Sequence, residues 1–143
     1  MERVGEHYTP ERGGGRLLIL VVERDPHIRE LEAHFLQRAG YSVEFTSDGR
    51  VALEQARQLH PDVIITEILV PKLDGLALCR QLKADAETRG ISVLIFSILA
   101  ASARAREAGA DAFLMKPLAE HRLITLVQSL LEKRPRPPAS ERT

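Results

Sequence analysis

Polar side chains stand directly after several short apolar runs of this sequence, and their types suit the binding of a metal ion or an anion. Residues 23–25, which read Glu-Arg-Asp, follow the first run, and Glu67 follows the third. Ser97 and Lys116 come at the ends of the fourth and fifth runs. Carboxylates are ligands for Mg²⁺, and hydroxyl and ammonium groups donate hydrogen bonds to anionic oxygens. Together these residues would form a compact polar cluster centred on Glu67.

The elements that must position this cluster are five apolar runs that alternate with five segments of helical periodicity. The runs cover residues 17–22, 41–45, 62–66, 92–97 and 112–115, and the helical segments cover 26–39, 49–59, 74–84, 100–108 and 118–132. Short runs buried on both faces predict a parallel sheet covered by helices. The sequence therefore predicts an α/β fold: a doubly wound five-stranded parallel sheet with helices on both faces. Its working site should lie at the carboxyl ends of the strands, where the polar residues fall.

Glycine, proline and aspartate residues mark the predicted helix boundaries. Gly40 and Gly109 follow two of the helical segments, where a left-handed residue is favoured. Pro26 and Pro117 stand at predicted helix starts, and Asp74 is placed to cap the third helix. These helix-boundary residues agree with the helical segments that the apolar periodicity predicts.

Length, charge and cysteine content limit the class of protein. The chain has 143 residues, which suits one domain. Its 20 basic and 20 acidic residues cancel, which argues against a dedicated nucleic-acid binder. The one cysteine, Cys79, excludes a disulfide framework and predicts a reducing, cytoplasmic location. The apolar runs are too short to cross a membrane.

The two ends of the chain differ in composition from the rest. Residues 1–15 are polar and end in three glycines, which predicts a flexible leader. Residues 134–143 contain three prolines and no apolar face, which predicts a disordered tail. Residues 16–133 remain as the folded domain.

Residues 17–133 resemble the receiver domain of two-component response regulators, the family that includes the chemotaxis regulators. The resemblance rests on LLILVVERDP, DVIITEILVPKLDGL, SVLIFS and EAGADAFLMKPL. It implies a flavodoxin-like sheet with strand order 2-1-3-4-5. Because no output domain follows, a stand-alone receiver is expected.

The resemblance also implies a role for residues at the strand ends. In the family, an Asp after the third strand accepts a phosphoryl group from a histidine kinase, and here that position is Glu67. Ser97 and Lys116 match the residues that contact the phosphoryl oxygens. Phe113 falls at the aromatic position that reorients on activation, and Pro117 at the loop proline with its cis peptide bond.

The metal-binding positions of the family are also altered here. Glu23 and Asp25 supply acids, but Arg24 stands where the second acid of the pair usually carries Mg²⁺, and Leu69 falls at the position whose carbonyl binds the metal. At 4 Å and an effective dielectric constant of 20, a unit charge and a divalent ion interact by roughly 8 kcal/mol. A cation at the position of Arg24 therefore predicts weak or absent Mg²⁺ binding and no metal cofactor.

These departures lead to two principal hypotheses. Glu67 extends the carboxylate by one methylene and could pair with either Lys116 or Arg24. The leading hypothesis is a degenerate, phosphorylation-independent receiver without catalytic activity. It would bind a histidine kinase, a downstream signalling protein or a second copy through residues 100–132, and neither nucleic acid nor membrane. The alternative is a receiver that accepts a phosphoryl group on Glu67 with Mg²⁺. A flavodoxin-like enzyme is disfavoured because no glycine-rich loop follows the first strand.

Overall fold

The protein structure, a computed structural model, describes residues 16–133. The terminal segments 1–15 and 134–143 lie outside the described residues. The strands are β1 (Leu18–Val22), β2 (Ser42–Thr46), β3 (Val63–Thr66), β4 (Ser92–Ser97) and β5 (Ala112–Met115). The helices are α1 (Pro26–Arg38), α2 (Gly49–Leu59), α3 (Gly75–Ala84), α4 (Ser102–Glu107) and α5 (Glu120–Lys133).

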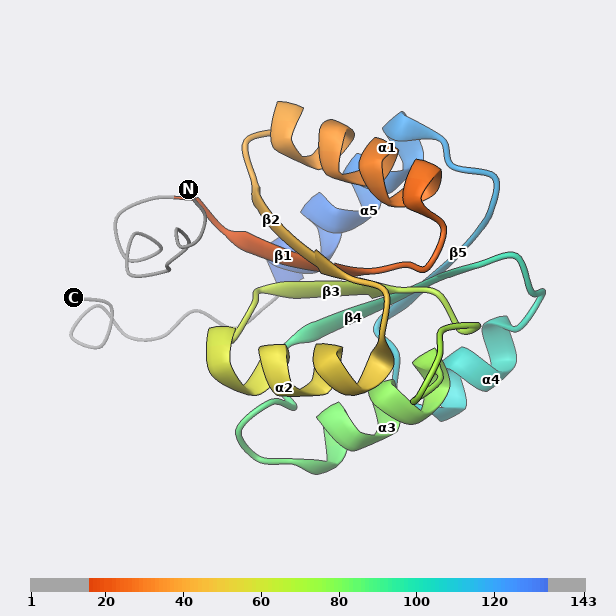
Figure 1. The fold of residues 1–143 in the computed structure, drawn as a ribbon. Helices are drawn as coiled ribbons and strands as arrows, with labels where there is room; N and C mark the ends of the chain where they lie inside the picture. Colours follow the sequence, from red (N-terminus) through yellow and green to blue (C-terminus); the bar gives the residue numbers. More distant parts are fainter. Residues whose placement is uncertain (1–15, 134–143) are drawn as a thin grey trace, which may run out of the picture.

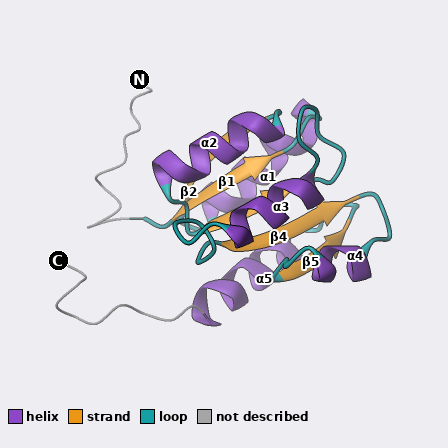
Figure 2. Cartoon of the chain, turned by 90° about the horizontal axis from the view of Figure 1, so that it is seen from below, coloured by secondary structure: helices purple, strands orange, loops and turns teal. Residues whose placement is uncertain are grey.

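The five strands form one parallel sheet in the order β2-β1-β3-β4-β5, which confirms the predicted topology. Helices α1 and α5 cover one face of the sheet, and α2, α3 and α4 cover the other (Figures 1 and 2). Strands β1, β3 and β4 are buried along their whole length. Strands β2 and β5 form the edges, so most of their side chains are only partly covered, and Phe45 is half-exposed. Burial on both faces therefore holds for the three central strands only.

The core has two apolar layers because alternate residues of a strand point to opposite faces. In β1, Leu20 and Val22 pack toward α2, α3 and α4, whereas Ile19 and Val21 pack toward α1 and α5. Cys79 belongs to the first layer, and burial raises the pKa of its thiol to about 11. It behaves there as a small apolar residue and not as a nucleophile.

Aspartate side chains cap three of the helices. Asp25, Asp48 and Asp74 each accept a hydrogen bond from a backbone N–H in the first turn of α1, α2 and α3. Gly40 and Gly109 follow α1 and α4 with φ of 101° and 95°, the left-handed region that favours glycine. The capping of α3 by Asp74 and the helix ends marked by Gly40 and Gly109 were predicted correctly.

Two predicted boundaries near the carboxyl end of the domain were wrong. Pro117 does not begin a helix, because α5 starts only at Glu120; the proline lies in the preceding loop, and its peptide bond to Lys116 is cis. Helix α4 covers Ser102–Glu107 and not 100–108. The Ala101 N–H bonds the Leu99 carbonyl in a turn before this helix.

The loop after β3 is held closely against neighbouring backbone. The Gly75 N–H donates to the Ile68 carbonyl at 2.9 Å, and the Gly49 N–H of α2 donates to the Pro71 carbonyl at 3.0 Å. A Cβ atom on Gly75 would lie 2.3 Å from the carbonyl oxygen of Glu67, so only glycine fits this approach. These contacts fix the backbone that carries Glu67. Within residues 16–133, the helices are too short or too polar to span a bilayer.

Candidate functional site

A buried ionic cluster lies at the carboxyl ends of the central strands. The side chains of Glu67 and Glu23 are 4% and 2% exposed, and both contact the Lys116 ammonium. Lys116 Nζ lies 3.0 Å from Glu67 Oε1 and 2.8 Å from Glu23 Oε1. The Ser97 hydroxyl donates a hydrogen bond to Glu67 Oε2. Three strand ends thus converge on one carboxylate, as the sequence predicted for Ser97 and Lys116.

Backbone N–H groups from two loops complete the contacts of this carboxylate. Glu67 Oε2 accepts from the N–H of Ile68 at 2.7 Å and more weakly from that of Leu69 at 3.4 Å. Its other oxygen, Oε1, accepts from the N–H of Ile98 at 3.2 Å. Converging backbone donors of this kind form an anion-binding concavity. The anion in this concavity is the protein's own side chain.

Hydrogen bonds and charge set the ionisation of the cluster. Burial acts to raise the pKa of the Glu67 carboxyl, but the hydrogen bonds from Ser97 and Lys116, the Lys116 charge and the Ile68 N–H outweigh it, so this pKa lies below its usual value. Burial acts to lower the pKa of Lys116, but its bonds to Glu23 and Glu67 raise it on balance. Glu67 and Lys116 are therefore both ionised at neutral pH, as a buried ion pair with its hydrogen bonds made.

The residues after Glu23 take other positions than expected. Asp25 is exposed and caps α1, accepting from the N–H of His27 at 2.9 Å. Arg24 is also exposed, and its guanidinium has no ion pair with any residue in 16–133. Of the two partners left open for Glu67, the structure has Lys116 and not Arg24. The electrostatic argument made from Arg24 is therefore not supported, since Arg24 is exposed and lies in the turn where Asp25 caps α1.

The receiver resemblance implies Mg²⁺, but the donor atoms here do not fit a magnesium site. Both oxygens of Glu67 accept hydrogen bonds from the protein. Glu23 pairs with Lys116 through one oxygen and accepts from the Asp25 N–H through the other at 3.1 Å. Within the described part of the chain, no group of three or more His, Cys, Asp or Glu residues is placed to hold a metal. A metal ion would have to displace the Lys116 ammonium from both carboxylates.

The other residues assigned from the resemblance lie in β5 and in the loops after β3 and β5. Phe113 is half-buried and packs against the apolar layer of α2, α3 and α4. The Leu69 side chain points outward and is 44% exposed, while its backbone N–H faces Glu67. Pro117 follows Lys116 through the cis bond. The roles in switching and binding that the resemblance assigns to them stay predictions.

A buried carboxyl group that the sequence reading missed lies near the cluster. Glu32 of α1 is 1% exposed, and its Oε1 atom has no hydrogen-bond partner. Burial raises its pKa well above the ordinary value, the charge of Glu23 raises it further, and Lys116 opposes the shift. The residue spacing could have indicated that Glu32 is buried, because Ile28, Glu32 and Leu36 share the core-facing side of α1 at four-residue intervals.

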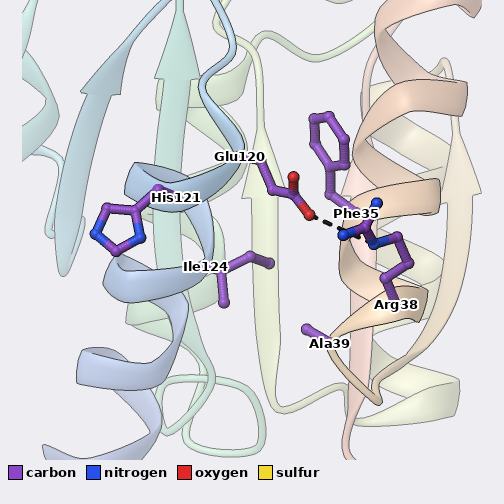
Figure 3. A pocket seen from close by; sticks show the side chains of 6 residues that line it. All are labelled: Phe35, Arg38, Ala39, Glu120, His121 and Ile124. Carbon is purple, nitrogen blue, oxygen red and sulfur yellow. Dashed lines mark ion pairs between the residues drawn. The ribbon is translucent and has the colours of Figure 1, made fainter.

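A surface pocket of about 360 Å³ lies away from this cluster, between α1 and α5 (Figure 3). Arg38 and Glu120 form an ion pair of 3.7 Å across it. It is lined by Phe35, Arg38, Ala39, Glu120, His121 and Ile124. None of the residues assigned to the strand-end site lines this pocket.

Comparison with known proteins agrees with this geometry. The family model described as the response regulator receiver domain matches residues 19–128. The response regulator MprA of Mycolicibacterium vanbaalenii is 37% identical over 116 residues, which cover 80% of this chain and 50% of that protein. The DNA-binding dual master transcriptional regulator RpaA of Synechocystis is 34% identical over 123 residues, which cover 84% and 51%. The chain thus spans about half the length of these curated relatives.

Solved structures show the same fold. The receiver domain of a signal transduction histidine kinase from Syntrophus aciditrophicus is 37% identical, with a TM-score of 0.79, over 85% of this chain and 95% of that one. The chemotaxis response regulator CheY4 of Vibrio cholerae is 28% identical, with a TM-score of 0.76, over 81% and 99%. The flavodoxin-like fold predicted from the sequence is confirmed.

Proposed function

The chain belongs to the response regulator receiver domain family, and we propose that it serves two-component signalling as a phosphorylation-independent protein-interaction module, a pseudo-receiver. One observation carries this proposal. The carboxylate of Glu67 accepts hydrogen bonds from Ser97, from Lys116 and from the Ile98 N–H. Ser97 and Lys116 stand at the positions that contact the phosphoryl oxygens in the family. The anion-binding groups of the site are therefore satisfied without a phosphoryl group.

Transfer of a phosphoryl group to Glu67 would disrupt these contacts. Both carboxylate oxygens are engaged, so an incoming phosphorus atom would have to break the bonds from Ser97 or from Lys116 and Ile98. The product would bring nearly two negative charges beside the buried Glu23 carboxylate. The donor set described above does not fit Mg²⁺, and phosphoryl transfer depends on positioning and on neutralisation of charge. We therefore propose no phosphotransfer step and no metal cofactor.

The Glu67 carboxylate is a partial substitute for a phosphoryl group. It supplies one charge and two oxygens, whereas a phosphoryl group supplies nearly two charges and three oxygens. It nevertheless joins the loops after β3 and β4, because Leu69 and Ile98 donate to the same side chain. The unmodified Glu67 side chain therefore links the two loops.

The proposed partner is a protein, either a histidine kinase or a downstream signalling protein, with a homodimer as a further form of assembly. The proposed surface is formed by α4, β5 and α5, within residues 100–132. It is connected to Glu67 through Ser97, whose Oγ accepts from the N–H of Leu99 at the start of the loop to α4. The single cysteine, free and buried, suits the reducing cytoplasm, which is the proposed location.

Intact mass measured after incubation with acetyl phosphate and Mg²⁺ tests the proposal. The native chain should gain no phosphoryl adduct, and neither should Glu67→Gln, which has no carboxylate at this position. Glu67→Asp alone should also stay unmodified, because Arg24 leaves the metal ligands incomplete. The double variant Glu67→Asp with Arg24→Asp restores both acids and should gain the adduct. An adduct on the native chain that is absent from Glu67→Gln contradicts the proposal.

A further inference from the structure

Glu32 is a buried carboxyl group that takes no part in the ion pairs of the site. Its Oε1 atom is enclosed and has no hydrogen-bond partner within the described residues. Ile28 and Leu36, four residues to either side of it on α1, pack in the apolar layer between the sheet and helices α1 and α5. A negative charge on Glu32 would therefore lie in apolar surroundings with one oxygen unbonded, which costs free energy.

The same apolar layer adjoins the ionic cluster. Lys116 Nζ lies 5.5 Å from the centroid of the Phe96 ring, and Phe96 packs in the layer beneath α1 and α5. The Arg29 guanidinium, three residues before Glu32, donates a hydrogen bond to the Glu23 carbonyl at 3.2 Å. Glu32 thus lies near the turn of α1 that contacts the cluster, and on the face of the sheet where Lys116 lies over Phe96.

Three buried carboxyl groups therefore lie near one buried ammonium. Glu23, Glu32 and Glu67 are all buried, and the side chain of Lys116 is 8% exposed and already pairs with Glu23 and Glu67. The charges of Glu23 and Glu67 oppose the ionisation of Glu32, and the charge of Lys116 favours it. Two carboxylates already outnumber the ammonium, so Glu32 holds its proton at neutral pH.

The nearest arginine of α1 is directed elsewhere. Arg29 bonds the Glu23 carbonyl through one nitrogen, and its guanidinium carbon lies 5.1 Å from the centroid of the Phe45 ring. Phe45 is half-exposed on the edge strand β2. The charge of Arg29 is thus placed toward the edge of the sheet, and Lys116 remains the buried cation of the cluster.

The remaining elements packed against α1 direct their charged groups away from Glu32. On β2, Glu44 lies beside Leu20 in the register and so faces the opposite apolar layer. Helix α5 contributes apolar side chains to the layer of Glu32, and its first acidic residue, Glu120, pairs with Arg38 at the surface. The ionisation of Glu32 is therefore set by its burial and by the ionic cluster.

We propose that Glu32 is a proton-binding positioning residue that controls how firmly Lys116 holds Glu67. While Glu32 carries its proton, Lys116 binds the carboxylates of Glu23 and Glu67, and Glu67 links the loops after β3 and β4. When the proton passes to solvent at alkaline pH, a third carboxylate competes for the ammonium, and the bond to Glu67 weakens. This inference rests on the proposed function, because the site that it regulates is the one that Glu67 fills.

NMR spectroscopy of the isotope-labelled full chain from about pH 5 to about pH 10 tests the coupling. Lys116 stays charged over this range, because its bonds to the two carboxylates raise its pKa above the ordinary value for lysine. The carboxyl carbon of Glu32 should show its ionisation step well above pH 4.5, since burial and the charge of Glu23 raise this pKa. The amide of Ile98, which bonds Glu67, should change its chemical shift with the same midpoint.

Two glutamine variants separate the proton on Glu32 from other effects of pH. Glu32→Gln has nearly the same shape but cannot ionise, so the step at Ile98 should disappear. Glu30→Gln is the matched control, since Glu30 lies on the same helix but is exposed, and the step at Ile98 should remain. Histidines ionise near about pH 6.5 in all three proteins, so their effect is removed when the variants are subtracted from the native chain.

Three results would overturn the coupling. The first is a Glu32 carboxyl that is already ionised at about pH 5 or still protonated at about pH 10. The second is an Ile98 amide whose signal stays constant while Glu32 ionises. Both are measured on the native chain, so they count even if Glu32→Gln does not fold. The third is a step at Ile98 that persists in folded Glu32→Gln.

The failure of this inference and that of the proposed function give different results. If the native chain gains a phosphoryl adduct from acetyl phosphate and its Ile98 amide still follows Glu32, the coupling stands and the proposed function fails. If the chain gains no adduct and its Ile98 amide does not follow Glu32, the proposed function stands and the coupling fails.

Discussion

Glu67 Oε1 accepts a hydrogen bond from the backbone N–H of Ile98 at 3.2 Å, so a side chain at the end of β3 holds the first residue of the loop after β4. The second oxygen of the same carboxylate binds the loop after β3. One side chain therefore fixes two loops relative to each other. Both contacts are made by the unmodified carboxylate.

Replacement of Lys116 by methionine should destabilise the domain strongly. It leaves the carboxylates of Glu23 and Glu67 buried side by side without a cation, and breaking a buried pair in this way costs about 3–5 kcal/mol of unfolding free energy. Urea unfolding at neutral pH measures the loss. Lys72→Met is the control, because Lys72 is exposed and should change stability by less than about 0.5 kcal/mol. Equal unfolding midpoints for the two variants would refute the buried cluster.

Ser97→Ala should cost about 1.5–3 kcal/mol of unfolding free energy, the contribution of a hydrogen bond to a charged group. The buried Ser97 hydroxyl donates to Glu67 and accepts from the Leu99 N–H. Thermal unfolding of Ser97→Ala is compared with that of Ser47→Ala, a control change at an exposed serine, and the difference in melting temperature measures the loss. If both alanine variants keep the native melting temperature, Ser97 does not stabilise the site.

Gly75→Ala should destabilise the domain by about 1–3 kcal/mol or more, as overpacking does. The new Cβ would meet the Glu67 carbonyl oxygen at 2.3 Å, which forces the loop after β3 to shift. Gly90→Ala is the matched control, because no atom lies within 4 Å of a Cβ built there. Denaturant unfolding of both variants checks the prediction. A Gly75→Ala variant as stable as Gly90→Ala would show that this close approach is absent in solution.

The free energy of unfolding should fall as the pH rises, because the buried Glu32 carboxyl becomes ionised. Burial raises the pKa of this carboxyl well above its ordinary value of 4.5. A raised carboxyl pKa in the folded state means that its contribution to stability is fully present below pH 4.5 and is lost as the pH rises through the raised value. Glu32→Gln cannot ionise and should not lose stability over this range.

Unfolding free energies of the native chain and Glu32→Gln, measured from acidic to alkaline pH, isolate this effect by subtraction. The lowered pKa of Glu67 acts in the opposite sense in both proteins, since its contribution is present above its ordinary pKa and is lost as the pH falls through the lowered value. A difference between the two proteins that does not change with pH would contradict the assignment to Glu32.

Local sequence patterns predicted the fold well because they report burial and capping directly. The apolar runs located all five strands, and Asp74 and Gly40 marked helix ends that the structure has. The structure differs from the sequence prediction where tertiary contacts determine how far a side chain is exposed. Phe45 is half-exposed because β2 is an edge strand, and the apolar periodicity alone does not give the strand order, which came from the receiver resemblance.

The sequence predicted which residues form the candidate site, but it predicted only in part which of them form ion pairs with one another. The ends of parallel strands meet at one edge, so Glu67, Ser97 and Lys116 were expected together. Whether Lys116 or Arg24 would pair with Glu67 depends on the turn after β1, where the capping of α1 by Asp25 directs Arg24 outward. The Ile98 N–H was not predicted, because any residue type can supply a backbone donor.

Amide hydrogen exchange at Ile98 is the most direct test of the claim that the Glu67 carboxylate fills the anion-binding site. The comparison is between the native chain and Glu67→Ala, which removes both acceptor oxygens but leaves Lys116 paired with Glu23. Glu54→Ala, at an exposed glutamate of α2, is the control. The account predicts exchange about 10- to 100-fold faster at Ile98 in Glu67→Ala alone, equivalent to about 1.5–3 kcal/mol. Equal exchange at Ile98 in the native chain and Glu67→Ala would contradict it.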